Sequence, residues 1–205
     1  MAAINLSSLA LSRLAANGLQ SRAAKTDRTI FIGVDLGKQQ CHSAIVVVER
    51  IEEGPSRDHI EVLRGTGSSR KRYVIRHVER VRLGTQHSDV VRRVKHVVSH
   101  LSVTMQATCV VVVDESGVGV PVVEAMREAG LGSFCRLNPV VITAGQSATA
   151  SSVPRAELIT KMKMMAERGE LELATGCMHG EWLKRELLHL RLEGGGLLLS
   201  ATIWP

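Results

Sequence analysis

The chain has 205 residues, a formal net charge of +6 and a hydrophobic fraction of 44%. A chain of this length forms one ordinary domain and buries a core without disulfides or structural metals. Aromatic residues make up 2% of the chain, too few for the base-stacking platform of a single-strand nucleic-acid binder. No apolar run approaches the roughly 18 residues that span a membrane, so we expect no membrane partner.

Positive charge is concentrated in one segment of the chain. Residues 57–100 contain eleven lysines and arginines against four acids. A basic face of this kind favours a polyanionic partner such as nucleic acid. A solvated surface of strands and a helix would explain the same charges, and the sequence leaves both interpretations open.

Composition divides the chain into three segments. Residues 1–26 contain no acid and place leucines roughly on one helical face, which predicts a helical or linker extension and also resembles a transit peptide in composition. We expect the folded domain to occupy residues 27–193. Residues 194–205 begin with three glycines and continue as a mostly apolar stretch, so they form an atypical tail.

Hydrophobic periodicity predicts the order of the elements. Runs at residues 30–35, 43–49 and 73–83 indicate three strands in an antiparallel meander. A helix is expected next, and two further strands then alternate with helices before a last amphipathic helix. The expected helices cover residues 88–101, 118–129, 153–168 and 182–192, and the later strands cover 108–113 and 134–142. The fold class is therefore α/β, with a mixed five-stranded sheet flanked by helices, in the strand order of the ribonuclease H-like fold.

Two aspartates that end predicted strands are the candidates for chemistry. Asp35 ends the first strand and Asp114 follows the fourth, and a glycine-containing turn comes after each. In the predicted fold these strands are neighbours, so both carboxylates converge at one edge of the sheet. The two like charges repel unless one carboxylate takes up a proton or a cation such as Mg²⁺ lies between them. Alternatively, each aspartate is only a turn residue or a helix cap.

Other motifs with known chemistry are absent or weak. The sequence has no Walker-type phosphate-binding loop and no nucleophile elbow. The four cysteines form no C-x-x-C pair, so we expect free thiols, and Cys177 with His179 is too small a set for a metal site. His96 and His100 share an i, i+4 spacing, but we interpret them as surface or core-edge residues.

Seven segments follow one another along residues 30–193. They are G-V-D-L-G-K-Q-Q (33–40), S-A-I-V-V-V-E (43–49), Y-V-I-R-H-V-E-R-V-R-L-G-T (73–85), V-D-E-S-G-V-G-V-P-V-V (113–123), P-V-V-I-T-A-G (139–145), V-P-R-A-E-L-I (153–159) and E-L (186–187). In this order and spacing they resemble the nuclease domain of phage terminase large subunits.

The resemblance implies a metal-dependent endonuclease that cuts concatemeric double-stranded phage DNA during packaging. It assigns Asp35 and Asp114 as catalytic metal ligands for Mg²⁺ or Mn²⁺, in a site expected to hold two ions. Lys38 and Arg155 become candidate DNA contacts, and Arg155 stands where the family usually has lysine. The expected partners are double-stranded DNA and a separate packaging ATPase, portal or small terminase subunit, in the cytoplasm of a bacterial host.

The chain also departs from the family pattern. Cys41 stands where the family usually has aspartate, and the chain has room for the nuclease module only. The family's third acid lies in a His-Asp-Asp-like motif near the C-terminus, which this sequence lacks. Glu157, Glu181 and Glu186 are the remaining alternatives, and nothing in their local sequence favours one of them.

Two further hypotheses therefore stay open. In the first, the chain is a catalytically incomplete prophage remnant that acts at most as a DNA- or partner-binding module. In the second, it is a sugar kinase or chaperone-type ATPase, because Gly-x-Asp-x-Gly also opens that superfamily. The second hypothesis is disfavoured, since such proteins need two facing domains and a Ser/Thr-rich phosphate loop that residues 38–40 do not supply.

Overall fold

The computed structural model describes residues 27–37, 41–53, 70–105, 107–117, 119–145, 147–149 and 151–189. The predicted extension at 1–26, the predicted tail at 194–205 and the candidate DNA contact Lys38 lie outside these residues. None of the helices in the described part combines the length and the apolar character needed to cross a membrane.

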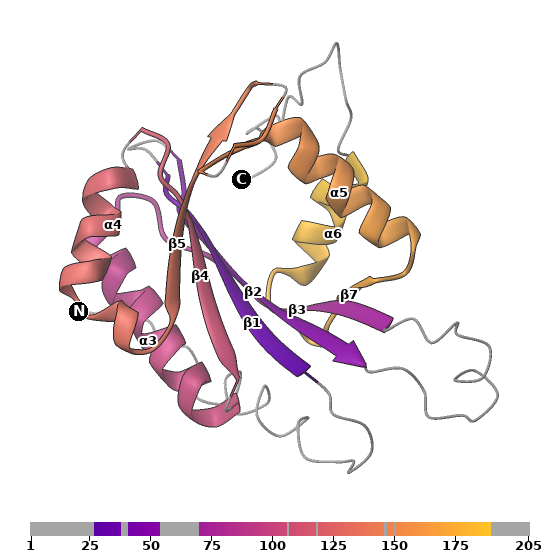
Figure 1. The fold of residues 1–205 in the computed structure, drawn as a ribbon, viewed down its shortest axis with the longest axis horizontal. Helices are drawn as coiled ribbons and strands as arrows, with labels where there is room; N and C mark the ends of the chain where they lie inside the picture. Colours follow the sequence, from indigo (N-terminus) through magenta and orange to yellow (C-terminus); the bar gives the residue numbers. More distant parts are fainter. Residues whose placement is uncertain are drawn as a thin grey trace.

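One mixed sheet forms the centre of the molecule, with the strand order β6-β5-β4-β1-β2-β3-β7 (Figure 1). Its strands are β1 (Asp27–Asp35), β2 (Ala44–Glu53), β3 (Arg70–Arg80), β4 (Thr108–Asp114), β5 (Arg136–Thr143), β6 (Ser152–Pro154) and β7 (Leu171–Leu173). The pairs β1–β2 and β2–β3 are antiparallel, whereas β1–β4, β4–β5, β5–β6 and β3–β7 are parallel.

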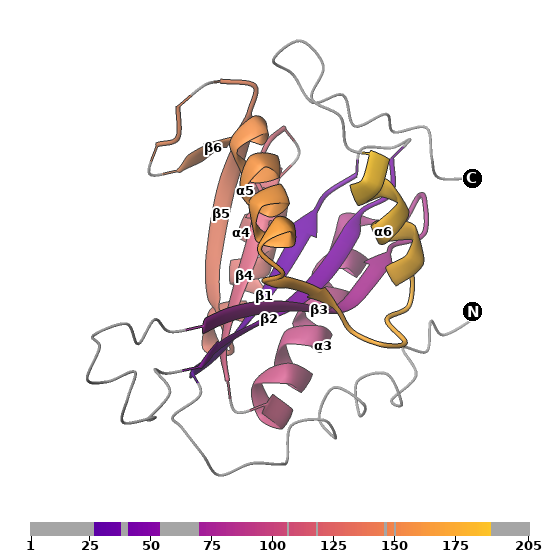
Figure 2. The ribbon, with the colours of Figure 1, turned by 90° about the vertical axis from the view of Figure 1, so that its right-hand side faces the viewer.

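Helices cover the two faces of this sheet. Helices α3 (His87–Met105) and α4 (Gly119–Glu128) lie on one face, and α5 (Arg155–Glu167) and α6 (Gly180–His189) lie on the other (Figures 1 and 2). A short 3-10 turn, η1 (Leu131–Ser133), joins α4 to β5. The molecule therefore has three layers, helix on sheet on helix.

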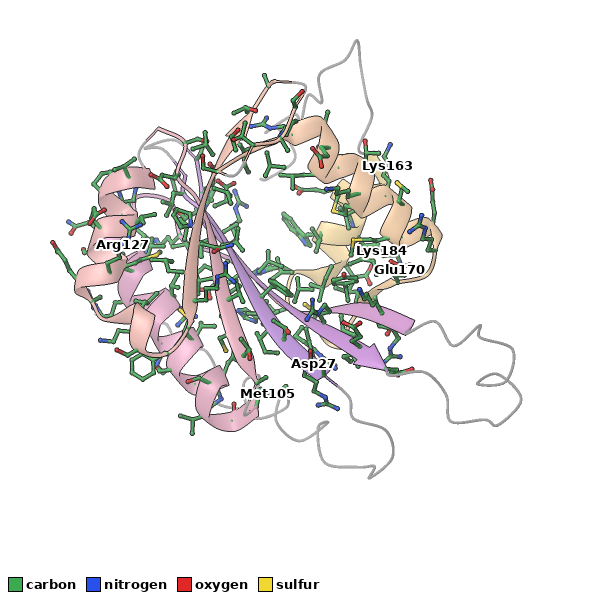
Figure 3. The ribbon with its side chains drawn as sticks, in the orientation of Figure 1. Asp27, Met105, Arg127, Lys163, Glu170 and Lys184 are labelled. Carbon is green, nitrogen blue, oxygen red and sulfur yellow. The ribbon has the colours of Figure 1, made fainter. Side chains whose placement is uncertain are left out.

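The core lies between the sheet and α3 with α4. The apolar stripe of α3 is fully covered, with Val90, Val91, Val94, Val97, Val98 and Leu101 each no more than 5% exposed. Alternate residues of the central strands meet this stripe, among them Ile32 of β1 and Val111 of β4. Each fully buried side chain of this size stabilises the fold by about 1.5–3 kcal/mol. In Figure 3 the drawn side chains fill this layer, with Arg127 on the outer side of α4.

Part of the positive charge that the sequence concentrates in residues 57–100 is paired with acids of the same domain. Five described lysines and arginines of this segment form ion pairs with acids, namely Lys71–Glu52, Arg72–Glu172, Arg76–Glu49, Arg92–Asp89 and Arg93–Glu79. Two of the acids, Glu49 and Glu79, are buried. Part of this segment's positive charge is therefore balanced by the domain's own acids, which agrees with the solvated-surface interpretation.

The expected mixed α/β class and the order of the long elements are confirmed. The sheet has seven strands where five were expected, because β6 and β7 add three residues each at its two edges. Three residues carry no readable period of two, so no sequence pattern could reveal them. Residues 153–154 belong to β6 rather than to the following helix, which begins at Arg155.

Candidate metal centre

Asp35 and Asp114 end adjacent parallel strands. Val34 of β1 pairs with Val113 of β4, so the aspartate that follows each valine lies at the same level of the sheet. Both valines are buried in the core beneath α3 and α4. Because successive strand residues point to opposite faces, both aspartates point to the face that carries α5 and α6. The structure therefore brings the two predicted carboxylates together on one face.

The loop after β4 fixes the Asp114 carboxylate. The Ser116 N–H donates a hydrogen bond of 2.9 Å to Oδ1 of Asp114. The Ser116 hydroxyl is itself held, since its Oγ accepts a hydrogen bond of 3.1 Å from the Ile142 N–H of β5. Gly119, the first residue of α4, passes so close that a Cβ there would lie 2.5 Å from the Asp114 carbonyl oxygen. This crowding requires glycine and ties the position of Asp114 to the start of α4.

The residues on either side of the loop after β1 also pack closely together. The Gly37 N–H donates a hydrogen bond of 3.1 Å to Oγ of Ser43, and a Cβ on Gly37 would lie 2.2 Å from the Cys41 carbonyl oxygen. After the loop, His42 contacts the residue that follows β3, because its Nδ1 lies 2.8 Å from the Val81 carbonyl oxygen. Cys41 itself is exposed. Contacts of Gly37 before the loop and of His42 and Ser43 after it therefore stabilise the end of β1 at Asp35.

Arg155 reaches the same end of the sheet from another element. Pro154 of β6 pairs with Thr143, the last residue of β5, and α5 begins with the next residue, Arg155. The β5 strand neighbours β4, so the start of α5 lies beside the strand end that carries Asp114. The Arg155 charge acts on the Asp35 carboxyl, which places a cation beside the predicted acid pair.

The electrostatics of the pair follow from this arrangement. Burial raises the pKa of the Asp35 carboxyl above its ordinary value, and the negative charge of Asp114 raises it further. The Arg155 charge and the Leu36 N–H hydrogen bond lower it, but the net shift remains upward. Asp35 is nonetheless an exposed residue, so protein atoms crowd its carboxyl without closing it off from solvent. A carboxylate in this position is short of compensating positive charge.

None of the three acids that the sequence left as alternatives completes the pair. Glu157 forms an ion pair with Lys161 at 2.6 Å, and Glu181 is exposed in the first turn of α6. Burial raises the pKa of Glu186 in α6, and the nearby Arg80 charge lowers it. Within the described residues, no group of three or more His, Cys, Asp and Glu side chains could hold a metal ion.

Arg80 is a neighbour of the site that the sequence did not single out. Asp35 pairs with Ala44 of β2, and Ala44 pairs with Arg80 of β3. Asp35, Ala44 and Arg80 therefore form one row across the sheet, with side chains on the same face. Through Arg80, the row extends to Glu186 of α6. Only the register of three strands reveals this row, so no local motif could have indicated it.

Two carboxylates that lie side by side suit a hard divalent cation. Carboxylate oxygens are the ligands that Mg²⁺ and Mn²⁺ prefer, and Mg²⁺ commonly binds through one or two carboxylates with water in the remaining positions. A cation between the two would also offset the repulsion that raises the Asp35 pKa. The chemistry open to such a centre is activation of water and stabilisation of charge on a phosphodiester.

Comparisons with known proteins find likeness in structure but not in sequence. No known protein family matches the chain, and neither does any curated protein. The human cytomegalovirus terminase nuclease domain is similar, with 11% identity over 86% of this chain and 79% of that one, and a TM-score of 0.55. Its Mn-soaked form gives 12% identity, coverage of 87% and 84%, and a TM-score of 0.53. RuvC of Thermus thermophilus gives 18% identity, coverage of 54% and 60%, and a TM-score of 0.32.

The likeness to the cytomegalovirus domain establishes the fold. It extends over most of both chains, at an identity too low to carry any residue's role from one to the other. The expected ribonuclease H-like, mixed α/β fold is thus confirmed, and so is the structural resemblance to terminase nuclease domains.

Proposed function

We propose that this chain is a metal-dependent nuclease module in which Asp35 and Asp114 hold Mg²⁺ or Mn²⁺. The observation that carries the proposal is the placement of both carboxylates at the same level of two adjacent parallel strands, on one face of the sheet. The raised pKa of Asp35, caused by burial and by Asp114, supports a site that lacks positive charge. The likeness in fold to a terminase nuclease domain, one form of which was soaked with manganese, supports the same chemistry.

Each residue has a distinct role in this proposal. A divalent ion held there would supply a nucleophilic water at neutral pH and would neutralise charge on the phosphodiester. Asp35 and Asp114 hold the ion, and the Ser116 N–H orients the Asp114 carboxylate through its bond to Oδ1. Arg155 lies beside the pair and contacts a phosphate oxygen of the substrate, where a guanidinium binds two oxygens at once.

The proposed substrate and setting rest on the seven segments of residues 30–193, whose order and spacing resemble those of phage terminase nuclease domains. We propose that double-stranded DNA is the substrate and that the cut serves phage DNA packaging. The partners would be a separate packaging ATPase, the portal or the small terminase subunit, in the cytoplasm of a bacterial host. In this setting Lys38 would join Arg155 as a second DNA contact.

The second candidate function is that of a binding module with the same fold and no nuclease activity. Glu186 of α6 lies near Arg80, which stands two strands away from Asp35 in the same row of the sheet. If two carboxylates do not suffice, the chain would bind DNA or a packaging partner without cutting. The pairing of five basic residues in the segment 57–100 with the domain's own acids leaves this candidate less surface for DNA than the sequence suggested.

Cleavage of supercoiled plasmid tests the proposal directly. We expect nicking by the purified chain in Mn²⁺, none in EDTA, and loss of nicking in Asp114→Asn. Asp89→Asn is the matched control, because Asp89 is exposed on α3 and forms its ion pair with Arg92. Nicking that survives Asp114→Asn would overturn the proposed centre.

Metal binding measured in parallel separates the two candidates. A folded chain that binds Mn²⁺ through Asp35 and Asp114 without nicking would favour the binding module. A chain that binds no Mn²⁺ would contradict the metal centre in both forms. Calorimetric titration with Mn²⁺ on the wild type, Asp35→Asn and Asp89→Asn supplies this measurement.

A further inference from the structure

Gly33 lies in the middle of β1 with open space above it. It is two residues before Asp35, so its missing side chain would point to the same face as that carboxylate. A Cβ placed on Gly33 would meet no described atom within 4 Å. A glycine in a strand interior weakens the strand, and it often marks a place where a ligand approaches the backbone closely. No contact within the described fold requires the glycine here.

The residues around Gly33 form an apolar floor. Gly33 pairs with Val46 of β2 on one side and with Val112 of β4 on the other. Both valines are partly exposed, although their neighbours along each strand are buried on the opposite face. Phe31 continues the floor along β1, and the Arg50 guanidinium lies over its ring, 5.8 Å from the centroid. We call the surface formed by Phe31, Gly33, Val46 and Val112 the Gly33 floor.

The two faces of the sheet are thus covered unequally. The face beneath α3 and α4 is a closed core, whereas the Gly33 floor stays partly open to solvent beneath α5 and α6. In Figure 3 the side chains drawn between the middle strands and α5 are sparser than those between the sheet and α3. The open face is the one to which Asp35 and Asp114 point.

We propose that the Gly33 floor holds the nucleoside unit that adjoins the scissile phosphate. This inference rests on the proposed nuclease function and adds a subsite to it. Two strand residues span about 6.6 Å, so the backbone positions of Gly33 and Asp35 are about that far apart on the same face of β1. The acid pair and Arg155 form a polar end that suits a phosphate with its metal ion. The floor beside it is made of apolar residues, and the Arg50 guanidinium lies over its far end at Phe31.

The apolar residues of the Gly33 floor also determine how the subsite binds a nucleoside. Glycine and valine offer no hydrogen-bonding side chains, so the contact with sugar and base is made by shape and apolar area. Such a contact accepts every base and carries no sequence preference. The absence of a side chain on Gly33 lets the sugar approach the strand, and any larger residue there would fill that space.

Substitution of Gly33 tests this subsite. Gly33→Val should fold normally, because a Cβ there meets no described atom within 4 Å and valine favours strands. The probes are thymidine 3′,5′-bisphosphate and inorganic phosphate, each titrated in Mn²⁺. We expect the wild type to bind the bisphosphate more tightly than phosphate, and Gly33→Val to weaken the bisphosphate about tenfold, because a side chain that overfills a contact site opposes binding. Affinities for phosphate and Mn²⁺ should stay unchanged.

Gly132→Ala is the matched control for a glycine with free space. A Cβ on Gly132 also meets no described atom within 4 Å, but this residue lies in η1, outside the sheet. Gly33→Ala should weaken the bisphosphate less than Gly33→Val does, and Gly132→Ala should leave it unchanged. A graded loss confined to position 33 would support the subsite.

Several outcomes would overturn the inference, and they differ from failure of the proposed function. Equal bisphosphate binding by wild type and Gly33→Val would show that the floor takes no nucleoside. A marked fall in the melting temperature of Gly33→Val would mean that part of the chain itself covers the floor. Normal Mn²⁺ binding without preference for the bisphosphate would remove only the subsite. Absence of Mn²⁺ binding in the wild type would remove the proposed function and the subsite together.

Discussion

Asp114 lies beside Asp35 across the β1–β4 pair, and its negative charge raises the pKa of the Asp35 carboxyl that burial has already raised. The fold thus holds two like charges together on one face, with Arg155 as the cation that acts on Asp35. An arrangement of this kind costs stability when no further cation is bound. Active centres commonly combine such costs with perturbed pKa values.

Asp35→Asn should therefore stabilise the protein at neutral pH. A carboxyl whose folded pKa is raised stabilises the fold while it is protonated, and that contribution is lost as the pH rises through the folded pKa. Removal of the charge should raise the melting temperature by about 1–3 °C at pH 7, a small rise because solvent screens the charge on an exposed residue. The difference from wild type should vanish below about pH 3.8, the ordinary value for this group.

Metal provides the second half of this test. Mn²⁺ should raise the melting temperature of the wild type and leave that of Asp35→Asn unchanged, because a ligand stabilises only the form that binds it. Asp89→Asn should behave oppositely to Asp35→Asn without metal, since it removes an acid from the first turn of α3. A lower melting temperature for Asp35→Asn at pH 7 would contradict the repulsion argument.

Arg93→Met should destabilise the protein strongly. Burial alone would raise the pKa of Glu79, but hydrogen bonds from His77 and Arg93 and their charges lower it overall. The Arg93 guanidinium donates to both carboxylate oxygens, at 2.9 and 3.1 Å. Its removal leaves a buried carboxylate that lacks its main partner, which costs about 3–5 kcal/mol. Urea unfolding at pH 7 measures this loss.

The pH dependence of the same pair gives an independent check. Since the folded pKa of Glu79 is lowered, its stabilising contribution is present above about pH 4.5 and is lost as the pH falls through the folded pKa. The double variant Arg93→Met, Glu79→Leu should recover most of the stability at pH 7, because buried ion pairs are replaceable by apolar residues. A double variant as unstable as Arg93→Met would show that the pairing is not the cause.

The sequence predicts an element of this structure well when the element is long enough to show a regular pattern of apolar residues. The stripe of α3 was predictable residue by residue, because six apolar positions at helical spacing leave one consistent buried face. The convergence of Asp35 and Asp114 was predictable from strand order, since each residue ends an apolar strand. The strands β6 and β7 were not, because three residues each are too short to show a period.

The rest of the site depends on register, which the sequence does not state. Arg80 joins the row of Asp35 only because Ala44 pairs with both residues. Likewise, the basic segment at 57–100 suggested a free positive face until acidic partners from β2, β7 and β3 were in place. The net charge of a sequence segment does not distinguish ion-paired side chains from free ones. For this reason the sequence suggested a free basic face where the structure has ion pairs.

Thiol labelling should distinguish the cysteines by burial. Cys41 is exposed, whereas burial and the neighbouring Cys135 raise the pKa of Cys109 to about 11. The thiolate is the reactive form, so at pH 8 iodoacetamide should modify Cys41 at least about 100-fold faster than Cys109. Peptide mass spectrometry after timed quenching measures the two rates, with urea-unfolded protein as the control in which both react. Comparable rates in the native chain would contradict the packing of β4.

Ser116→Ala tests how the Asp114 carboxylate is held. The Ser116 hydroxyl accepts a hydrogen bond from the Ile142 N–H and thereby fixes the loop whose own N–H binds Oδ1 of Asp114. Without the hydroxyl the loop loses its side-chain bond to β5, and the carboxylate of Asp114 is held less firmly. Loss of a group that orients a metal ligand typically weakens metal binding about 10- to 100-fold. We expect a loss of this size in Mn²⁺ titration of Ser116→Ala.

The control separates positioning from general destabilisation. Ser99→Ala removes a hydroxyl that binds the His96 carbonyl on the exposed side of α3, far from both aspartates in sequence and on another layer. It should leave Mn²⁺ affinity unchanged. Ser116→Thr keeps the hydroxyl and should restore most of the affinity that Ser116→Ala loses. Equal Mn²⁺ affinity in Ser116→Ala and wild type would show that backbone contacts alone, such as the Glu115 N–H to Val140 carbonyl bond of 2.8 Å, position Asp114.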